Sequence, residues 1–139
     1  MKIEFTKKDC QFILTELMKV YTKETKLIGK NKVFQKKDFD VRIDAKFLND
    51  KLKSVTFKSM KEFNGIYKNN SITLDKDLQH NPKNLIKVII HELVHHIQVH
   101  CFCEGSYKLF CMYYLLNGDS LERDAERFAK LLHKKFEFD

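Results

Sequence analysis

The chain has 139 residues, enough for one domain of ordinary size rather than two. Hydrophobic residues make up 43% and charged residues 32%, with a single Pro, which excludes disordered, collagen-like and low-complexity classes. The net charge is +7, but 19 acidic residues are interspersed with the 26 basic ones, and no recognised nucleic-acid-binding motif accompanies the charge.

The same composition bears on localisation. No apolar run approaches the ~20 residues that a membrane span needs, and residues 1–9 are too charged for a signal peptide. We therefore expect a cytoplasmic protein with one domain, residues 1–139. In a reducing compartment the cysteines are expected to be unpaired thiols: Cys10, Cys101, Cys103 and Cys111.

The first expected element is a helix that begins near Thr6, which can act as its cap with Asp9 as partner three residues on. Apolar residues then recur at helical spacing: Ile13, Leu14, Leu17, Met18 and Tyr21. Gly29 is expected to end this helix.

Residues 31–77 have strand character and predict a small sheet of three or four strands. Residues 41–43 alternate between apolar and polar side chains. Residues 54–57 form a short segment of high β-propensity. Residues 65–67 and 71–74 flank Lys68-Asn69-Asn70, which is typical of a hairpin turn.

A second helix is expected to begin at Asn81-Pro82, because Asn can cap a helix and Pro is favoured at its first position. Apolar residues between 85 and 98 cover nearly all sides, so this helix should be central and buried. Residues 104–106 break the pattern.

Two further helices are expected after this break. One covers residues 107–116 and ends at Asn117-Gly118, and the last begins at Asp119 or Ser120. The apolar stripe of the last helix consists of Leu121, Ala125, Phe128, Ala129 and Leu132.

The central helix carries the motif His91-Glu92-x-x-His95. Residues four apart project from one helix face, so both imidazoles can reach a single Zn²⁺. Glu92 is placed to reach a water beside the metal, where it can take and later deliver a proton.

A catalytic zinc needs a third protein ligand and an open position. The last helix offers Glu122 as that ligand, and Glu126 on the same face can hydrogen-bond the free N–H of a ligand histidine. Position 101, where a metzincin would have a histidine, is Cys101, and a fourth ligand from His100, Cys101 or Cys103 would indicate a closed, structural site.

Other histidines and the aromatic residues remain secondary candidates. His96 and His100 form another pair four residues apart, expected to be exposed or capping side chains near a helix end, with a second metal site as the alternative. The donors that could stabilise a tetrahedral intermediate are Tyr107, Tyr113, Tyr114 and His133.

The motif, followed after 26 residues by Glu122-x-x-Ala125-Glu126, resembles the gluzincin arrangement of HExxH and a downstream ExxxE. The pattern of Glu122, Ala125 and Phe128-Ala129 is similar to the ImmA/IrrE family of small cytoplasmic metallopeptidases, as is the hairpin before the motif. The resemblance covers roughly residues 60–132, an extent set by those motifs.

The resemblance implies an α+β, zincin-like fold with an N-terminal helix, the small sheet, the HExxH helix and a C-terminal helix that carries the third ligand. It implies one zinc held by His91, His95 and Glu122, Glu92 as general base, and hydrolysis of peptide bonds in a protein substrate. The alternatives are a non-catalytic zinc-stabilised binding module with a basic surface and a DNA-associated SprT-like protease, although the third histidine of the latter is absent.

Overall fold

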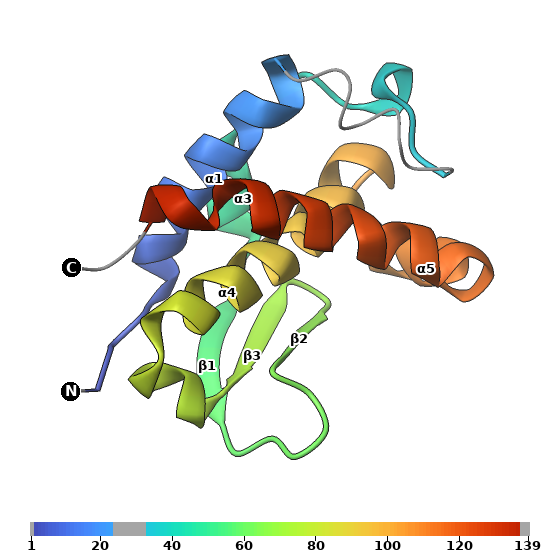
Figure 1. The fold of residues 1–139 in the computed structure, drawn as a ribbon. Coiled ribbons are helices and arrows are strands. Elements are labelled where there is room, and N and C mark those ends of the chain that lie inside the picture. Colours follow the sequence, from blue (N-terminus) through green and yellow to red (C-terminus); the bar gives the residue numbers. More distant parts are fainter. Residues whose placement is uncertain (1, 24–32, 137–139) are drawn as a thin grey trace.

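The computed structural model describes residues 2–23 and 33–136, so Gly29, the expected end of the first helix, lies outside the described residues. The described residues form an α+β fold with four α-helices and a three-stranded mixed sheet (Figure 1). The helices are α1 (Lys7–Lys23), α3 (Ala45–Lys51), α4 (Pro82–Ile97) and α5 (Tyr107–Leu132). The strands are β1 (Ser54–Lys58), β2 (Gly65–Lys68) and β3 (Ser71–Asp75). Among these helices none is long and apolar enough to cross a membrane.

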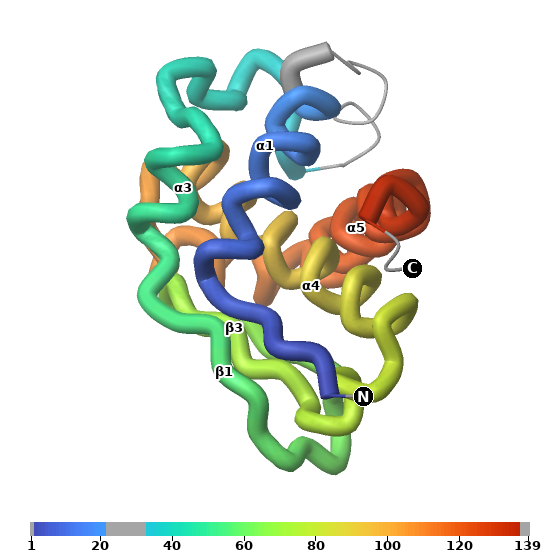
Figure 2. Tube along the Cα trace, turned by 90° about the vertical axis from the view of Figure 1, so that its left-hand side faces the viewer, coloured from blue at the N-terminus to red at the C-terminus, as the bar shows by residue number. Residues whose placement is uncertain are grey.

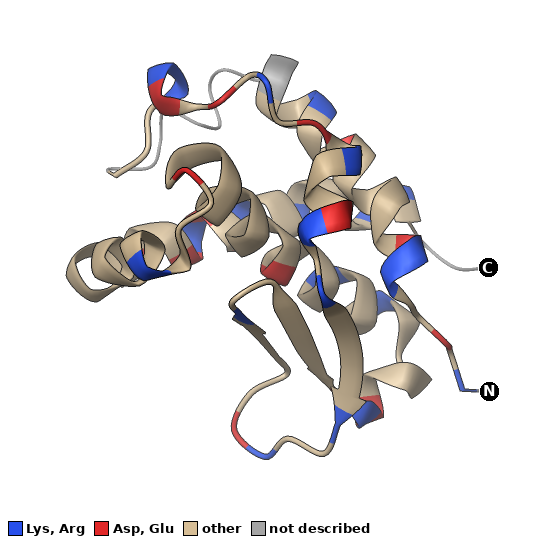
Figure 3. Cartoon of the chain, turned by 180° about the vertical axis from the view of Figure 1, so that it is seen from behind, with Lys and Arg blue, Asp and Glu red and all other residues tan. Residues whose placement is uncertain are grey.

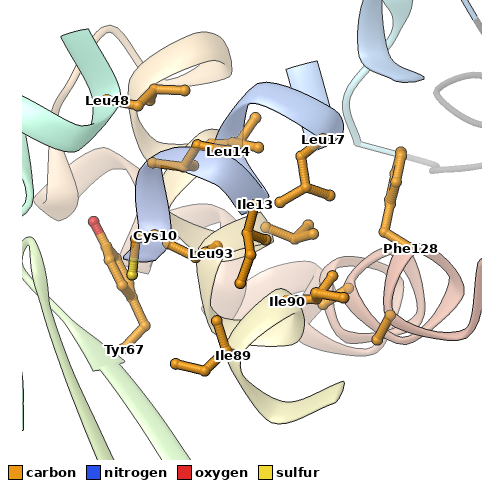
Figure 4. Packing of buried hydrophobic residues seen from close by; sticks show 14 of the residues in the cluster. Cys10, Ile13, Leu14, Leu17, Leu48, Tyr67, Ile89, Ile90, Leu93 and Phe128 are labelled. Carbon is orange, nitrogen blue, oxygen red and sulfur yellow. The ribbon is translucent and has the colours of Figure 1, made fainter. Parts of the chain in front are cut away.

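Helix α1 begins as expected. The Asp9 carboxylate accepts hydrogen bonds from the backbone N–H of Thr6 at 2.8 Å and from its hydroxyl at 3.2 Å. The apolar face is confirmed, since all five residues of the expected stripe are buried: Ile13, Leu14, Leu17, Met18 and Tyr21. Figure 4 shows side chains of α1, α3 and α4 gathered in this core, which fixes α1 against the central helix.

The hairpin is confirmed. Strands β2 and β3 pair antiparallel, and Asn69 and Asn70 between them have φ values of 44° and 69°. Asn tolerates this left-handed region, which two-residue hairpin turns require. Strand β1 joins the other side of β3 in parallel, so the order β1-β3-β2 leaves β2 at an edge of the described sheet.

The expected strand at residues 41–43 is wrong, because these residues form a turn. The Asp40 carboxylate accepts hydrogen bonds from both the backbone and the guanidinium of Arg42. Asp44 then caps α3 by accepting from the backbone N–H of Phe47 at 2.8 Å. Local side-chain acceptors therefore outweigh the alternation of residues 41–43.

Helix α4 occupies the centre. Asn81 caps it by accepting from the backbone N–H of Asn84, and Pro82 is its first residue. Figure 2 shows α4 between α1 and α5, and Figure 1 shows it above the sheet. Ten of its residues are buried, in agreement with the expected central position. The chain then continues directly into a π-helical turn, Gln98–Phe102.

The two helices expected after residue 106 are confirmed as the two parts of α5, which meet at a kink at Asn117. Ser106 caps it by accepting from the backbone N–H of Leu109 at 3.1 Å. Asn117 has non-helical angles (φ −141°, ψ 36°), so the first part ends at Asn117-Gly118 as expected and the second begins directly after it. The expected stripe of the second half is buried, whereas the first half projects from the body (Figure 1) and leaves Leu115 85% and Leu116 78% exposed.

Candidate metal centre and cleft

The two motif histidines meet Glu122 where α5 crosses α4. The Nε2 atom of His95 lies 2.7 Å from Glu122 Oε1, and the Nε2 atom of His91 lies 3.0 Å from Oε2. One carboxylate therefore contacts both imidazoles, each through a different oxygen. The helix spacing that aligns the histidines and the packing of α5 on α4 together produce this convergence.

This donor set fits a divalent metal ion. Ligand-type atoms of His91, Glu92 and His95 all lie within 4.8 Å of one another. Metal–ligand distances of about 2.0–2.2 Å in a tetrahedral site would place neighbouring donor atoms about 3.3–3.6 Å apart. The Glu122 contacts of 2.7 and 3.0 Å would have to open by about 0.3–0.9 Å to reach these separations.

The other ring nitrogen of each histidine also has a partner. His91 Nδ1 lies 2.7 Å from Glu126 Oε1, the type of contact that the sequence analysis expected for Glu126. His95 Nδ1 lies 2.9 Å from Gln98 Oε1. Sequence reasoning did not single out Gln98, although its position three residues after His95 places it on the same helix face.

The charges of the centre are strongly coupled. Burial lowers the pKa of His91, but Glu122, Glu92 and Glu126 outweigh burial and raise it to about 9. Burial raises the pKa of Glu122, and the hydrogen bonds from His91 and His95 reverse this and hold it well below its usual range. The centre is therefore arranged to balance a positive charge, as a metal ion would supply.

Glu92 lies beside this centre and against the sheet. Burial raises the pKa of its carboxyl, although His95, His91 and the backbone of Tyr67 act in the opposite direction. Gly65 of β2 brings the strand close, since an added Cβ there would lie 2.7 Å from Val88 Cγ1 and 3.3 Å from Glu92 Cγ. A larger residue at position 65 would push β2 away from Glu92.

The four residues of the centre open into a cleft of about 410 Å³. Its polar side consists of His91, Glu92, His95 and Glu122. Its apolar walls come from the β2 region and from the projecting half of α5: Phe63, Ile66, Tyr107, Phe110, Tyr114 and Leu115. A larger cavity of about 680 Å³ lies elsewhere, against residues 33–47 and 100–105, and does not contain the motif.

Of the tyrosines considered as donors, Tyr107 and Tyr114 line the cleft. Burial raises the pKa of Tyr114, and its hydrogen bond to Glu122 raises it further, so the phenol stays protonated. Tyr113 instead packs its ring edge-on to Phe34, with centroids 5.5 Å apart. His133 lies against backbone carbonyls of α5, away from the cleft.

The expectation that His96 and His100 are exposed or capping side chains is wrong for both, because both are buried, His96 fully. Its Nε2–H donates to the carbonyl of Leu48 at 2.7 Å, and its Nδ1 lies 2.7 Å from the Tyr67 hydroxyl. His100, also buried, donates through Nε2 to Asn70 Oδ1 at 2.6 Å. These partners give the pair a structural role in joining α4 to α3 and to the hairpin.

All four cysteines are free thiols, as expected. Burial raises the pKa of Cys10 and Cys103 to about 12, so both thiols are neutral. Cys101 lines the larger cavity, and neither it, Cys103 nor His100 belongs to the metal-type cluster of the described residues. Cys111 is exposed and lines the cleft.

Comparison of the chain with protein-family models, with curated proteins and with solved structures finds no match. The fold is therefore assigned as α+β from its own elements. Among the described residues, His91, Glu92 and His95 form a group that could hold a metal ion, and Glu122 lies against both histidines.

Proposed function

We propose that this chain is a zinc-dependent metallopeptidase of the gluzincin type, with His91, His95 and Glu122 as zinc ligands. The observation that carries the proposal is the convergence of both Nε2 atoms on one Glu122 carboxylate beside Glu92, in an open cleft. Two imidazoles, one carboxylate and an open side constitute the donor set of a catalytic zinc rather than a closed structural one. A bound zinc would polarise the scissile carbonyl and acidify water.

Glu92 is the general base in this proposal. Its carboxyl is buried beside the histidines and its pKa is raised, which brings it closer to the range in which it can both take and return a proton. It accepts a proton from the attacking water and delivers it to the leaving amine nitrogen. Tyr114, a protonated phenol in the same cleft, donates to the oxygen that becomes negative.

A polypeptide substrate is supported by the shape of the cleft. The edge strand β2 runs along it, and an extended peptide can pair its backbone with such an edge. Ile66, Tyr114 and Leu115 provide an apolar wall for substrate side chains. The resemblance to ImmA/IrrE proteins favours a cytoplasmic protein substrate, and the four free thiols agree with a reducing compartment.

The charges of the described residues on one face of the molecule do not favour the DNA-associated alternative. On the face drawn in Figure 3, basic residues are spread over several elements with acidic residues between them. A nucleic-acid-binding surface would concentrate basic side chains in a stripe or patch. Salt-dependent DNA binding by the purified protein would restore that alternative.

The test begins with elemental analysis of the purified protein, which should contain one zinc per chain. His95→Ala and Glu122→Ala should lose that zinc. Glu92→Gln should keep it while kcat/KM on a fluorogenic peptide library falls by about 10²–10⁴-fold, because only proton transfer is removed. Glu104→Gln, an exposed glutamate outside the cleft, is the matched control and should retain full activity.

Each failure has a defined meaning. Zinc retained in Glu122→Ala would contradict Glu122 as the third ligand. The wild type could instead contain one zinc per chain but show no peptidase activity, or only activity that persists in Glu92→Gln. That result would favour the non-catalytic binding module. A wild-type protein that takes up no zinc on reconstitution would overturn the proposal.

A further inference from the structure

Gln98 is a fully buried polar residue placed directly at the junction of α4 and the π-helical turn. It follows His95 by three residues, so its side chain lies over the same face of the helix. Isolated π-helical turns at helix ends change which face the following residues present and occur frequently at functional sites. Gln98 therefore combines an unusual backbone setting with contact to a proposed metal ligand.

The side chain of Gln98 connects the two helices that carry the proposed ligands. Its Oε1 atom lies 2.9 Å from His95 Nδ1 on α4. Its Nε2 atom donates to Asp124 Oδ2 at 3.1 Å and to the carbonyl of Leu121 at 3.2 Å, both on α5. Leu121 precedes Glu122 directly, so the same amide holds the backbone beside the third ligand.

The direction of the amide is determined by these partners. The carbonyl of Leu121 is an acceptor only, and the Asp124 carboxylate accepts from Arg127 and from the Tyr21 hydroxyl. Reversing the amide would place Gln98 Oε1 against two acceptor oxygens, which is unfavourable in a buried setting. The NH₂ group therefore faces α5, and the oxygen faces His95.

An oxygen that can only accept selects one protonation pattern of His95. Its Nδ1 must carry a hydrogen, so Nε2, which hydrogen-bonds Glu122 in the metal-free protein, is the nitrogen left to bind a metal ion. Nε2 is the atom that lies 2.7 Å from Glu122 Oε1, where the proposed ligands converge. His91 is oriented differently, by the carboxylate of Glu126.

We infer that Gln98 is a positioning residue that keeps a proton on His95 Nδ1 and thereby directs Nε2 to the metal, with Asp124 setting the direction of the amide. The part concerning metal affinity rests on the proposed function. The part concerning the proton on Nδ1 applies to the metal-free protein as well.

The first measurement is ¹⁵N NMR of the histidine ring nitrogens in the metal-free wild type. The inference requires a proton on His95 Nδ1. In Gln98→Leu, which removes the acceptor, the neutral ring should shift toward the form with its proton on Nε2, facing Glu122. A wild-type His95 with bare Nδ1 and a proton on Nε2 would overturn the inference whether or not any variant folds.

The second measurement is zinc affinity by competition with a chromophoric chelator, with thermal unfolding of the metal-free protein recorded beside it. Gln98→Leu should weaken zinc binding by about 10–100-fold, the usual effect of removing a partner of a metal-ligating histidine. The matched control is Gln79→Leu, another buried glutamine, which bonds the carbonyl of Ile3 far from the cleft and should leave the affinity unchanged. Wild-type affinity in a folded Gln98→Leu protein would overturn the inference.

Asp124→Asn tests the direction of the amide. The isosteric change lets Gln98 turn around, so zinc affinity should fall by less than in Gln98→Leu, and the double variant should be no weaker than Gln98→Leu alone. Strictly additive losses would contradict the coupling. Failure of the wild type to bind zinc would instead contradict the proposed function, and the NMR measurement would then decide the role of Gln98.

Discussion

Two pairs of histidines with the same four-residue spacing lie within ten residues of each other, and the structure uses them differently. His91 and His95 face the carboxylate of Glu122 in an open cleft. His96 is buried and hydrogen-bonds the Leu48 carbonyl and the Tyr67 hydroxyl, and His100 hydrogen-bonds the side chain of Asn70. Sequence spacing alone therefore does not distinguish a metal-binding pair from a structural one.

The pKa shifts of His91 and His96 run in opposite directions. Burial lowers the pKa of His96 to about 3, since its partners are an uncharged carbonyl and hydroxyl. His91 is also penalised by burial, but the surrounding carboxylates raise its pKa to about 9. Carboxylates around a histidine stabilise a positive charge there, whereas neutral partners in a buried site favour the neutral ring.

The largest expected difference is between a substitution in the His91/His95 pair and the same substitution in the His96/His100 pair. His91→Ala removes a proposed ligand itself and should weaken zinc binding by more than about 100-fold. Loss of a hydrogen-bond partner of a ligand has an effect of up to about that size. His96→Ala should leave zinc affinity unchanged but lower the free energy of unfolding of the metal-free protein by about 2–4 kcal/mol, since it opens a cavity and leaves buried groups unpaired. Chelator competition and urea unfolding measure the two effects. Loss of zinc in a folded His96→Ala protein would contradict the distinction.

Tyr114→Phe tests whether the Tyr114 hydroxyl, on the open side of the cleft, acts as a hydrogen-bond donor in the reaction. Removing a donor to the developing negative oxygen should lower kcat by about 10²-fold or more with little change in zinc content. Tyr113→Phe is the matched control, because Tyr113 is the neighbouring tyrosine and packs on Phe34 instead. Equal kcat values for the two variants would remove Tyr114 from the mechanism.

Glu126→Gln tests how much the carboxylate behind His91 contributes. The amide oxygen can still accept from His91 Nδ1–H but without the charge, so zinc affinity should fall by about 10-fold, the lower end for partners of ligand histidines. Chelator competition measures it, with Glu104→Gln as the control for loss of one exposed negative charge. A loss as large as that of Glu122→Ala would show that Glu126 is itself a ligand.

The smallest expected effect concerns the structural pair. Tyr67→Phe removes the hydroxyl that lies 2.7 Å from His96 Nδ1 and should lower the free energy of unfolding by about 1–2 kcal/mol. Zinc affinity should not change. Combined with His96→Ala the losses should be less than additive, because both changes remove the same hydrogen bond. Fully additive unfolding energies would indicate that the two side chains act independently.

Much of the local structure could be predicted from the sequence, because its signals act over a few residues. Asn81-Pro82 determines where α4 begins, and Asn69-Asn70 determines the hairpin turn. The periodicity of apolar residues marks the buried faces of α1 and of the second half of α5. The HExxH spacing places His91 and His95 on one face regardless of the rest of the chain.

Other features depend on which elements pack together. Residues 41–43 alternate like a strand but form a turn in which Asp40 binds Arg42, and they do not belong to the described sheet β1-β3-β2. A short alternation forms a strand only where a neighbouring strand can pair with it.

The sequence by itself determined the caps, the turn, the helix faces and the presence of two aligned histidines with a glutamate between them. Only the tertiary structure decided that α5 crosses α4 at Glu122, that Gln98 joins the two helices, and that His96 is structural. The physical reason is range. Caps and periodicities act between residues a few positions apart, whereas Glu122, Tyr67 and Leu48 lie up to 48 residues from the histidines that they contact and meet them only when the core packs.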